Sequence, residues 1–182
     1  MAAGETTGTL FPPSSYPAEP SRPFWLRLFW VMCQCVIDSE YRETLNEEDS
    51  VIPEQPSYLA GRVTLVLDLD ETLIHSSPDA LLGWDFTVPF AAEEGPQLRY
   101  VKKRPGVDLF LSRVCALFEV MIFTASTQNY ASAVIDKLDP NHLIHTRIYR
   151  EACIQRPEGF VKDLRKLNRD LHRVIIVDVG LT

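Results

Sequence analysis

The sequence predicts an α/β fold with a parallel sheet, and three observations support this. Short continuous apolar runs at 63–67, 120–123 and 174–177 are typical of strands that are buried on both faces. Segments with helical periodicity lie between these runs. The resulting order of strand, helix and strand is that of a parallel sheet, in which ligands bind at the carboxyl ends of the strands.

Two helices are predicted between these strands. Pro105 opens the first, because proline is favoured at the start of a helix, and the second follows Thr124 and stops at Asp139-Pro140. Each helix has one apolar face, with offsets of three, four, seven and ten positions in the first helix and of four positions between successive residues in the second. These faces consist of Val107, Phe110, Leu111, Val114 and Leu117 in the first helix and of Tyr130, Val134 and Leu138 in the second.

A hairpin insert and two further elements complete the predicted domain. Two β-rich pieces, near 84–90 and 98–102, flank the turn residues 93–96 and predict the hairpin. A further strand is predicted near 144–149. Asp163 is expected to cap a last helix, because aspartate is favoured at that position. The apolar residues of that helix are Leu164, Leu167 and Leu171.

The composition indicates one globular domain with an N-terminal extension. The chain has 182 residues, of which 46% are hydrophobic and 24% charged, enough for one domain but not for two. We expect a disordered tail at 1–22, which is rich in Pro, Ser, Gly and Thr. An apolar helix follows at 23–37, then an acidic linker at 38–60, and the domain occupies 61–182.

The apolar segment 23–37 has two readings. With 15 residues it is shorter than the roughly 20 that cross a bilayer. Its phenylalanine and tryptophan residues suit a membrane interface, so it is either a peripheral membrane anchor or a helix that packs on the domain or on a partner. The sequence does not separate these alternatives.

Charge and cysteine content exclude two classes of protein. The formal net charge of -7 argues against direct nucleic-acid binding, which depends on clustered Lys and Arg. The four cysteines form neither a dense disulfide framework nor a CxxC zinc pair, which indicates a reducing compartment.

Polar side chains follow three of the predicted strands, at the point where each strand ends. Asp68 and Asp70 follow the first, Thr124 and Ser126 the next, and Asp178 the last. Paired carboxylates directly after a buried strand are either solvated or bind a positive group. Taken alone, the two hydroxyl residues are better explained as a cap of the helix that follows them.

Five sequence blocks occur in order and resemble the small CTD phosphatase family of the haloacid dehalogenase superfamily. They are Val66–Ser76 with the signature DLDET, Lys103–Pro105, Ile122–Ser126, Tyr149–Cys153 and Val161–Leu164. This family includes TFIIF-associating, NLI-interacting-factor-like and Dullard-type phosphatases. The resemblance extends from Arg62 to Asp178 and implies a haloacid-dehalogenase-like, Rossmann-type parallel sheet with a β-hairpin insert.

The resemblance implies a Mg²⁺-dependent protein serine/threonine phosphatase. Asp68 would be the nucleophile that forms an aspartyl-phosphate and a side-chain ligand of Mg²⁺. Asp70 would be the general acid and base, with its backbone carbonyl as a second ligand, and Thr72 would hold Asp70 in place. Asp178 would be a further metal ligand.

The other matching positions would bind the substrate. Thr124 would donate a hydrogen bond to a phosphoryl oxygen, and Lys162 would neutralise charge on the phosphoryl group and on the nucleophile. Taken alone, a lysine is usually solvated. Arg150, Tyr130 and Ser126 would contact the phosphoserine or phosphothreonine protein. Arg104 is assigned no catalytic role.

The chain departs from the family after its last predicted strand. Val179 stands where the family has an asparagine that binds the metal, and the chain ends at Thr182, where the family continues. We therefore expect a shortened form with weak or no activity. The alternative function is a catalytically inactive module that binds phosphoproteins or is tethered to a membrane. A phosphatase of small metabolites is not favoured, because the matches at 103–105 and 149–151 belong to the protein-phosphatase branch.

The family suggests two kinds of substrate and two locations. One is the RNA polymerase II C-terminal domain, and the other is a regulator at the nuclear envelope or endoplasmic reticulum. We accordingly expect a nuclear protein, or one on the cytoplasmic face of these membranes.

Overall fold

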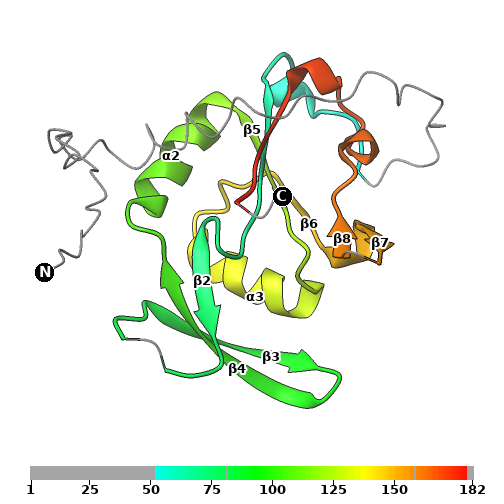
Figure 1. Cartoon of the computed structure of the whole chain (residues 1–182). Helices are drawn as coiled ribbons and strands as arrows, with labels where there is room; N and C mark the ends of the chain where they lie inside the picture. The colour runs from blue at the N-terminus through cyan, green and yellow to red at the C-terminus, as the bar shows by residue number, and fades with distance from the viewer. Residues whose placement is uncertain (1–51, 81, 158, 180–182) are drawn as a thin grey trace, which may run out of the picture.

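The computed structural model describes residues 52–80, 82–157 and 159–179 and has a four-stranded parallel sheet at its centre (Figure 1). The strand order is β6-β5-β1-β9, with all three pairings parallel. The strands are β1 (Thr64–Leu67), β5 (Glu119–Phe123), β6 (Thr146–Ile148) and β9 (Val174–Val177). This confirms the predicted α/β class.

Continuous apolar strands produce two cores, one on each face of the sheet. Successive side chains of a strand point to opposite faces. In β1, Leu65 and Leu67 belong to the larger cluster, whereas Val66 belongs to the smaller one. In β5, Val120 and Met121 divide in the same way. Both faces of the sheet are therefore covered by apolar side chains, which explains why these strands show no alternation of polar and apolar residues.

The larger core is covered by the two α-helices of the described residues, α2 (Val107–Leu117) and α3 (Gln128–Leu138). Helix α3 and its stop after Leu138 agree with the prediction. Helix α2 begins at Val107 rather than at Pro105, because Gly106 before it has a left-handed φ of 84°. Leu117 is 69% exposed, contrary to the predicted apolar face, and Cys115 is buried in its place. Leu117 is the last residue of α2, after which the chain becomes extended.

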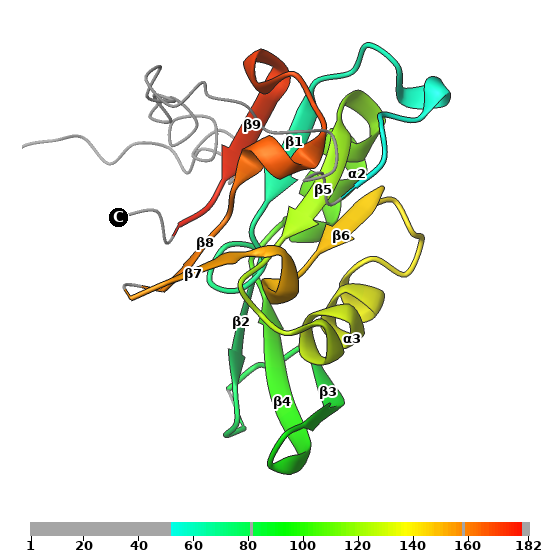
Figure 2. The same ribbon diagram turned by 90° about the vertical axis from the view of Figure 1, so that its right-hand side faces the viewer.

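A second, antiparallel sheet extends away from the parallel strands (Figure 2). Its order is β2-β4-β3, with β2 (Ile74–Ser77), β3 (Phe86–Ala92) and β4 (Gly95–Lys103). The hairpin β3–β4 confirms the predicted insert, while β2 was not predicted. Phe90 of β3 packs edge-on against Tyr130 of α3, with ring centroids 5.2 Å apart. This contact brings the insert beside a helix that contributes to the site.

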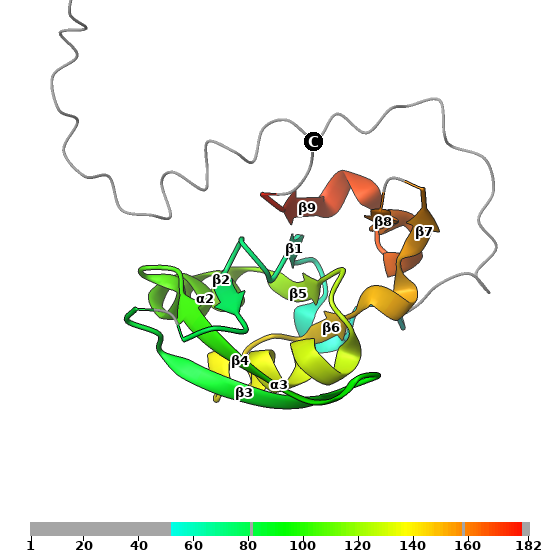
Figure 3. The ribbon, with the colours of Figure 1, turned by 60° about the horizontal axis from the view of Figure 1, so that its bottom comes forward.

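The smaller core is covered by irregular segments on the opposite side of the parallel sheet (Figure 3). The predicted helix after Asp163 is wrong. Two short 3₁₀ turns occur instead. Asn168 between them has a left-handed backbone, with φ 50°, which ends the first turn. The side chain of Asp170 starts the second turn by accepting a hydrogen bond from the His172 amide. The turns are η4 (Leu164–Leu167) and η5 (Leu171–Arg173). Asp163 does cap the first of them.

Three short elements lie at the edges of these layers. They are η2 (Ser57–Leu59), η3 (Arg150–Ala152) and the two-stranded hairpin of β7 (Ile154–Arg156) and β8 (Gly159–Val161). β8 leads directly to Lys162, and η3 follows β6. Both segments therefore enter the site from beyond the carboxyl end of the parallel sheet.

The part of the expected linker that the structure describes packs on the domain. Ile52 belongs to the smaller core, and the Gln55 side chain donates to the Arg62 carbonyl at 3.2 Å and to Glu119 at 3.0 Å. The tail 1–22 and the apolar segment 23–37 lie outside the described residues. Within the described part of the chain, no helix is both long and apolar enough to span a bilayer. The predicted domain boundaries thus stay predictions.

Candidate active site

The DLDET signature forms a closed turn after β1. Asp68 leaves the sheet at the carboxyl end of β1, and its amide still donates to the Val177 carbonyl of β9 at 2.9 Å. The turn is closed by the Leu73 amide, which donates to Leu69 O at 2.9 Å. Glu71 within it is left-handed, with φ 60°. The sheet therefore fixes Asp68, and the turn fixes the side chains of the next residues.

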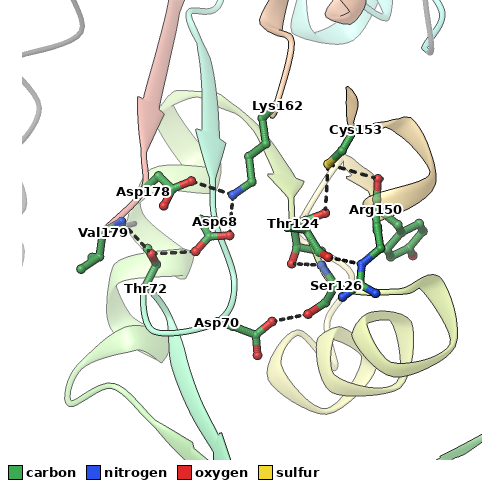
Figure 4. A network of polar contacts seen from close by, with 12 residues as sticks. Asp68, Asp70, Thr72, Thr124, Ser126, Arg150, Cys153, Lys162, Asp178 and Val179 are labelled. Atoms are coloured by element: carbon green, nitrogen blue, oxygen red, sulfur yellow. Dashed lines mark hydrogen bonds and ion pairs between the residues drawn. The ribbon is translucent and has the colours of Figure 1, made fainter. Parts of the chain in front are cut away.

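Asp68 lies in a buried group of charges with Lys162 and Asp178 (Figure 4). Nζ of Lys162 lies 2.6 Å from Asp68 Oδ1 and 2.7 Å from Asp178 Oδ2. The other oxygen of Asp68 accepts a hydrogen bond from the Thr72 hydroxyl at 2.9 Å. Burial raises the pKa of Asp68, and the charge and hydrogen bond of Lys162 oppose that rise. One ammonium thus contacts two carboxylates from adjacent strand ends, and the group keeps an excess of negative charge when both are ionised.

Asp70 is held by two hydroxyl groups rather than by a cation. Ser126 Oγ donates to Asp70 Oδ2 at 2.7 Å, and the Tyr130 hydroxyl donates to Oδ1 at 2.7 Å. The same phenol oxygen lies 2.7 Å from Ser76 Oγ. Because a phenol has one proton to donate, the Ser76 hydroxyl donates to Tyr130. Burial and then the charge of Asp70 raise the pKa of Tyr130, so the phenol remains protonated and donates.

One predicted contact is corrected by this arrangement. Thr72 was expected to hold Asp70, but its hydroxyl donates to Asp68 instead. The left-handed backbone at Glu71 turns the following residue back toward Asp68. Tyr130 is 8% exposed and its hydroxyl donates to Asp70, so its expected contact with the peptide stays a prediction.

Thr124 and Arg150 both lie beside Ser126 (Figure 4). Thr124 follows β5, is buried, and accepts from the Ser126 amide at 3.0 Å through Oγ1. Arg150 donates from Nε to the Ala125 carbonyl at 2.5 Å, and its guanidinium lies over the Phe160 ring, 4.8 Å from the centroid. Arg150 is exposed at the rim of the site. The predicted substrate roles of these two side chains stay predictions.

The oxygen atoms at this edge suit a hard cation. Asp68 and Asp178 converge on the same ammonium, and carboxylate and carbonyl oxygens are the ligands that Mg²⁺ prefers. The side chain of Val179 has no oxygen, while its amide donates to Thr72 Oγ1 at 3.2 Å. Across the described residues, no group of three or more His, Cys, Asp and Glu side chains is placed to hold a metal. Two carboxylates, those of Asp68 and Asp178, therefore converge at this edge, and their expected role as metal ligands stays a prediction.

Two residues of the site were not predicted from the sequence. Ser76 extends the hydroxyl chain to Asp70 through Tyr130, and Arg104 donates to the carbonyls of Glu71 and Thr72, each at 2.6 Å. Both lie within matching sequence blocks, at 66–76 and 103–105. The sequence match therefore included both residues, but only the tertiary structure shows which groups their side chains contact.

Comparisons with known proteins identify the family and support the fold. Residues 63–180 match the family model of the NLI interacting factor-like phosphatases. A probable C-terminal domain small phosphatase of Dictyostelium discoideum is 44% identical over 142 residues, 78% of this chain and 46% of the relative. The human carboxy-terminal domain RNA polymerase II polypeptide A small phosphatase 2 is 44% identical over 128 residues, 70% of this chain and 47% of the relative.

A solved structure supports the fold independently. The fission yeast RNA polymerase II CTD phosphatase Fcp1, in a variant bound to beryllium fluoride, aligns with a TM-score of 0.51 and 27% identity. The alignment covers 63% of this chain and 36% of the Fcp1 chain. The chain spans about half or less of the length of these relatives. From the family match and the named phosphatases among its relatives, the chain belongs to the NLI interacting factor-like phosphatase family.

Proposed function

We propose that this chain is a Mg²⁺-dependent protein serine/threonine phosphatase that reacts through an aspartyl-phosphate on Asp68. The observation that carries the proposal is the pairing of buried Asp68 with Lys162 at 2.6 Å, beside an Asp70 that is held by hydroxyl groups. A cation beside the nucleophile offsets the repulsion between a carboxylate and an anionic phosphoryl group.

In the first step a carboxylate oxygen of Asp68 attacks phosphorus. The bond from phosphorus to the serine or threonine oxygen breaks, and Asp70 gives its proton to that leaving oxygen. Ser126 and Tyr130 hold both oxygens of Asp70, which orients the group toward the leaving oxygen. In the second step water attacks phosphorus, Asp70 takes the water proton, and the bond between Asp68 and phosphorus breaks. Inorganic phosphate is released and both carboxyl groups return to their starting states.

Asp68, Asp178 and the carbonyl of Asp70 would hold Mg²⁺, which supplies positive charge at the phosphoryl oxygens when bound. Lys162 contacts both of these carboxylates, so it must share them with the cation. Thr124 would donate to a phosphoryl oxygen, since its hydroxyl proton is not used in the contact with the Ser126 amide.

The test is hydrolysis of p-nitrophenyl phosphate and of a phosphoserine peptide, with Mg²⁺ and with a chelator. We expect turnover only with Mg²⁺, lost in Asp68→Asn. The matched control is Asp136→Asn, whose carboxylate forms an exposed pair with Arg147 on the protein surface. Beryllium fluoride, a mimic of a phosphoryl group on a carboxylate, should raise the melting temperature of the unaltered chain but not of Asp68→Asn. Hydrolysis that survives Asp68→Asn would refute the proposal.

The second candidate is a catalytically inactive module that binds phosphoproteins, and Val179 favours it. The isopropyl group offers no metal ligand, so Mg²⁺ has one protein oxygen fewer than in a site with asparagine. This candidate predicts that a phosphoserine peptide binds without turnover at saturating Mg²⁺. It further predicts that binding depends on Arg150, which is exposed beside Ser126.

For substrate and location we propose a phosphoserine or phosphothreonine protein in the nucleus or at the nuclear envelope and endoplasmic reticulum. The nuclear part is supported by relatives named for RNA polymerase II. The membrane part depends on the apolar segment 23–37 alone. Deleting this segment should lower the membrane-pelleted fraction; an unchanged fraction removes the membrane part of the proposal.

A further inference from the structure

One residue supplies hydrogen bonds to three consecutive carbonyls of the catalytic turn. Arg104 donates from Nη2 to Glu71 O and from Nε to Thr72 O, each at 2.6 Å. Its backbone amide donates to Leu73 O at 3.0 Å. The two side-chain bonds are charge-assisted, and the planar guanidinium fixes their relative direction. Arg104 therefore holds the orientation of two successive peptide planes.

These are the peptide planes on which the site depends. Glu71 is left-handed, a conformation that a residue with a Cβ seldom adopts, so the turn needs contacts that maintain it. Asp70 precedes this residue and Thr72 follows it. A rotation of either peptide plane would move both side chains at once.

The turn is connected to Asp68 through the Thr72 hydroxyl. Thr72 Oγ1 donates to Asp68 Oδ2 at 2.9 Å and accepts from the Val179 amide at 3.2 Å. This hydroxyl keeps both partners only while the backbone at Thr72 keeps its orientation. The Arg104 contact with Thr72 O therefore acts on Asp68 through one intervening residue.

The position of Arg104 also joins the insert to the turn. It directly follows β4, whose last residue, Lys103, pairs with Ile74 of β2. The end of the hairpin strand is thus fastened to the same turn that carries Asp70. Movement of the hairpin would be transmitted to the catalytic carboxylates through this arginine.

We propose that Arg104 is a positioning residue for the phosphatase reaction, holding the turn so that Asp68, Asp70 and Thr72 keep their relative placement. This rests on the proposed function. A positioning residue that does not touch the substrate lowers kcat with little effect on KM, because it sets the geometry of the reacting groups and not the contacts of the bound substrate.

The first test compares Arg104→Ala and Arg104→Lys with Arg147→Ala, which removes a partly buried arginine of β6 that pairs with the exposed Asp136 outside the site. We expect kcat for p-nitrophenyl phosphate to fall on the order of 100-fold in Arg104→Ala, as for a displacement of about 1 Å. Arg104→Lys should retain only part of the kcat of the unaltered chain, because an ammonium lacks the planar, paired donors of a guanidinium. Added guanidinium ion should partly restore Arg104→Ala, a rescue that a general loss of folding would not show. KM should stay within about twofold, and Arg147→Ala should be unchanged in both constants.

The second test needs no turnover and separates this proposal from the proposed function. The Leu73 and Ile74 amides both donate to Leu69 O, so their hydrogen exchange reports closure of the turn. Exchange of a peptide spanning 69–74 should accelerate in Arg104→Ala and not in Arg147→Ala. If the unaltered chain lacks activity, the proposed function fails while this measurement still decides the role of Arg104. Unchanged exchange, or kcat within twofold of the unaltered chain in Arg104→Ala, would overturn the proposal.

Discussion

Replacing Lys162 with methionine tests how strongly this lysine stabilises the site. Its ammonium lies 2.6 Å from Asp68 and 2.7 Å from Asp178, and all three side chains are about one-tenth exposed. Methionine has a similar length and no charge. The substitution therefore leaves two adjacent buried carboxylates without their common cation, at the expense of little packing.

The expected loss follows from that burial. Removing one partner of a buried ion pair costs roughly 3–5 kcal/mol, because the remaining charge stays desolvated. One carboxyl group can take up a proton and limit this cost, so we expect a loss of about 3 kcal/mol in the free energy of unfolding. The control is Lys103→Met. The partner of Lys103, Asp108, is 66% exposed, and loss of such a surface pair costs less than about 1 kcal/mol.

Urea denaturation with and without Mg²⁺ measures both effects. A ligand that binds only the folded state stabilises it, and Mg²⁺ would replace the charge that Lys162→Met removes. We therefore expect Mg²⁺ to stabilise Lys162→Met more than the unaltered chain. Two results together would refute the interpretation that these contacts form a buried charge cluster able to bind a metal. The first is a loss of stability in Lys162→Met no larger than in Lys103→Met, and the second is equal stabilisation of Lys162→Met and of the unaltered chain by Mg²⁺.

Three further predictions concern single contacts. Burial raises the pKa of Glu119, but hydrogen bonds from Arg169, Thr64 and Gln55 hold this pKa below its usual 4.5. In urea titrations across pH, Glu119→Gln should therefore be less stable above 4.5, and the difference should vanish as pH falls through the lowered pKa. Tyr130→Phe should lower kcat for p-nitrophenyl phosphate roughly tenfold through the lost bond to Asp70, whereas a purely peptide-binding role would raise only the peptide KM. Val179→Asn should lower the Mg²⁺ concentration for half-maximal binding, measured by calorimetry, by roughly tenfold.

Strands buried on both faces were predictable because their signal is local. β1 and β9 lie where continuous apolar runs predicted them, since β1 is buried at all four positions and the partly buried residues of β9 pack against both cores. β2 was missed because its sequence, Ile-His-Ser-Ser, has no such run and becomes a strand through pairing with β4. The error at 163–173 has a different cause. Leucine spacing suggested a helix, but side-chain bonds of Asp163 and Asp170 to nearby amides favoured separate turns.

The site was predictable as a set of residues but not as a set of contacts. Asp68 and Asp178 follow adjacent parallel strands, so the fold alone brings them together. Lys162 approaches from a segment 94 residues beyond Asp68, and only the resemblance placed it there. The partner of Thr72 depended on the φ of Glu71, which no pattern in the sequence reports.

The contacts give the two carboxylates of the signature different surroundings. Asp68 is buried against a cation, which favours the charged form that a nucleophile needs and opposes the effect of burial on its pKa. Within the described residues, the Asp70 side chain accepts hydrogen bonds from two neutral hydroxyl groups, those of Ser126 and Tyr130. A group that must gain and lose a proton in one cycle is better held by such donors than by a fixed ion pair, which would resist protonation. The proposed separation of roles between two residues only two positions apart therefore depends on which distant segments contact each of them.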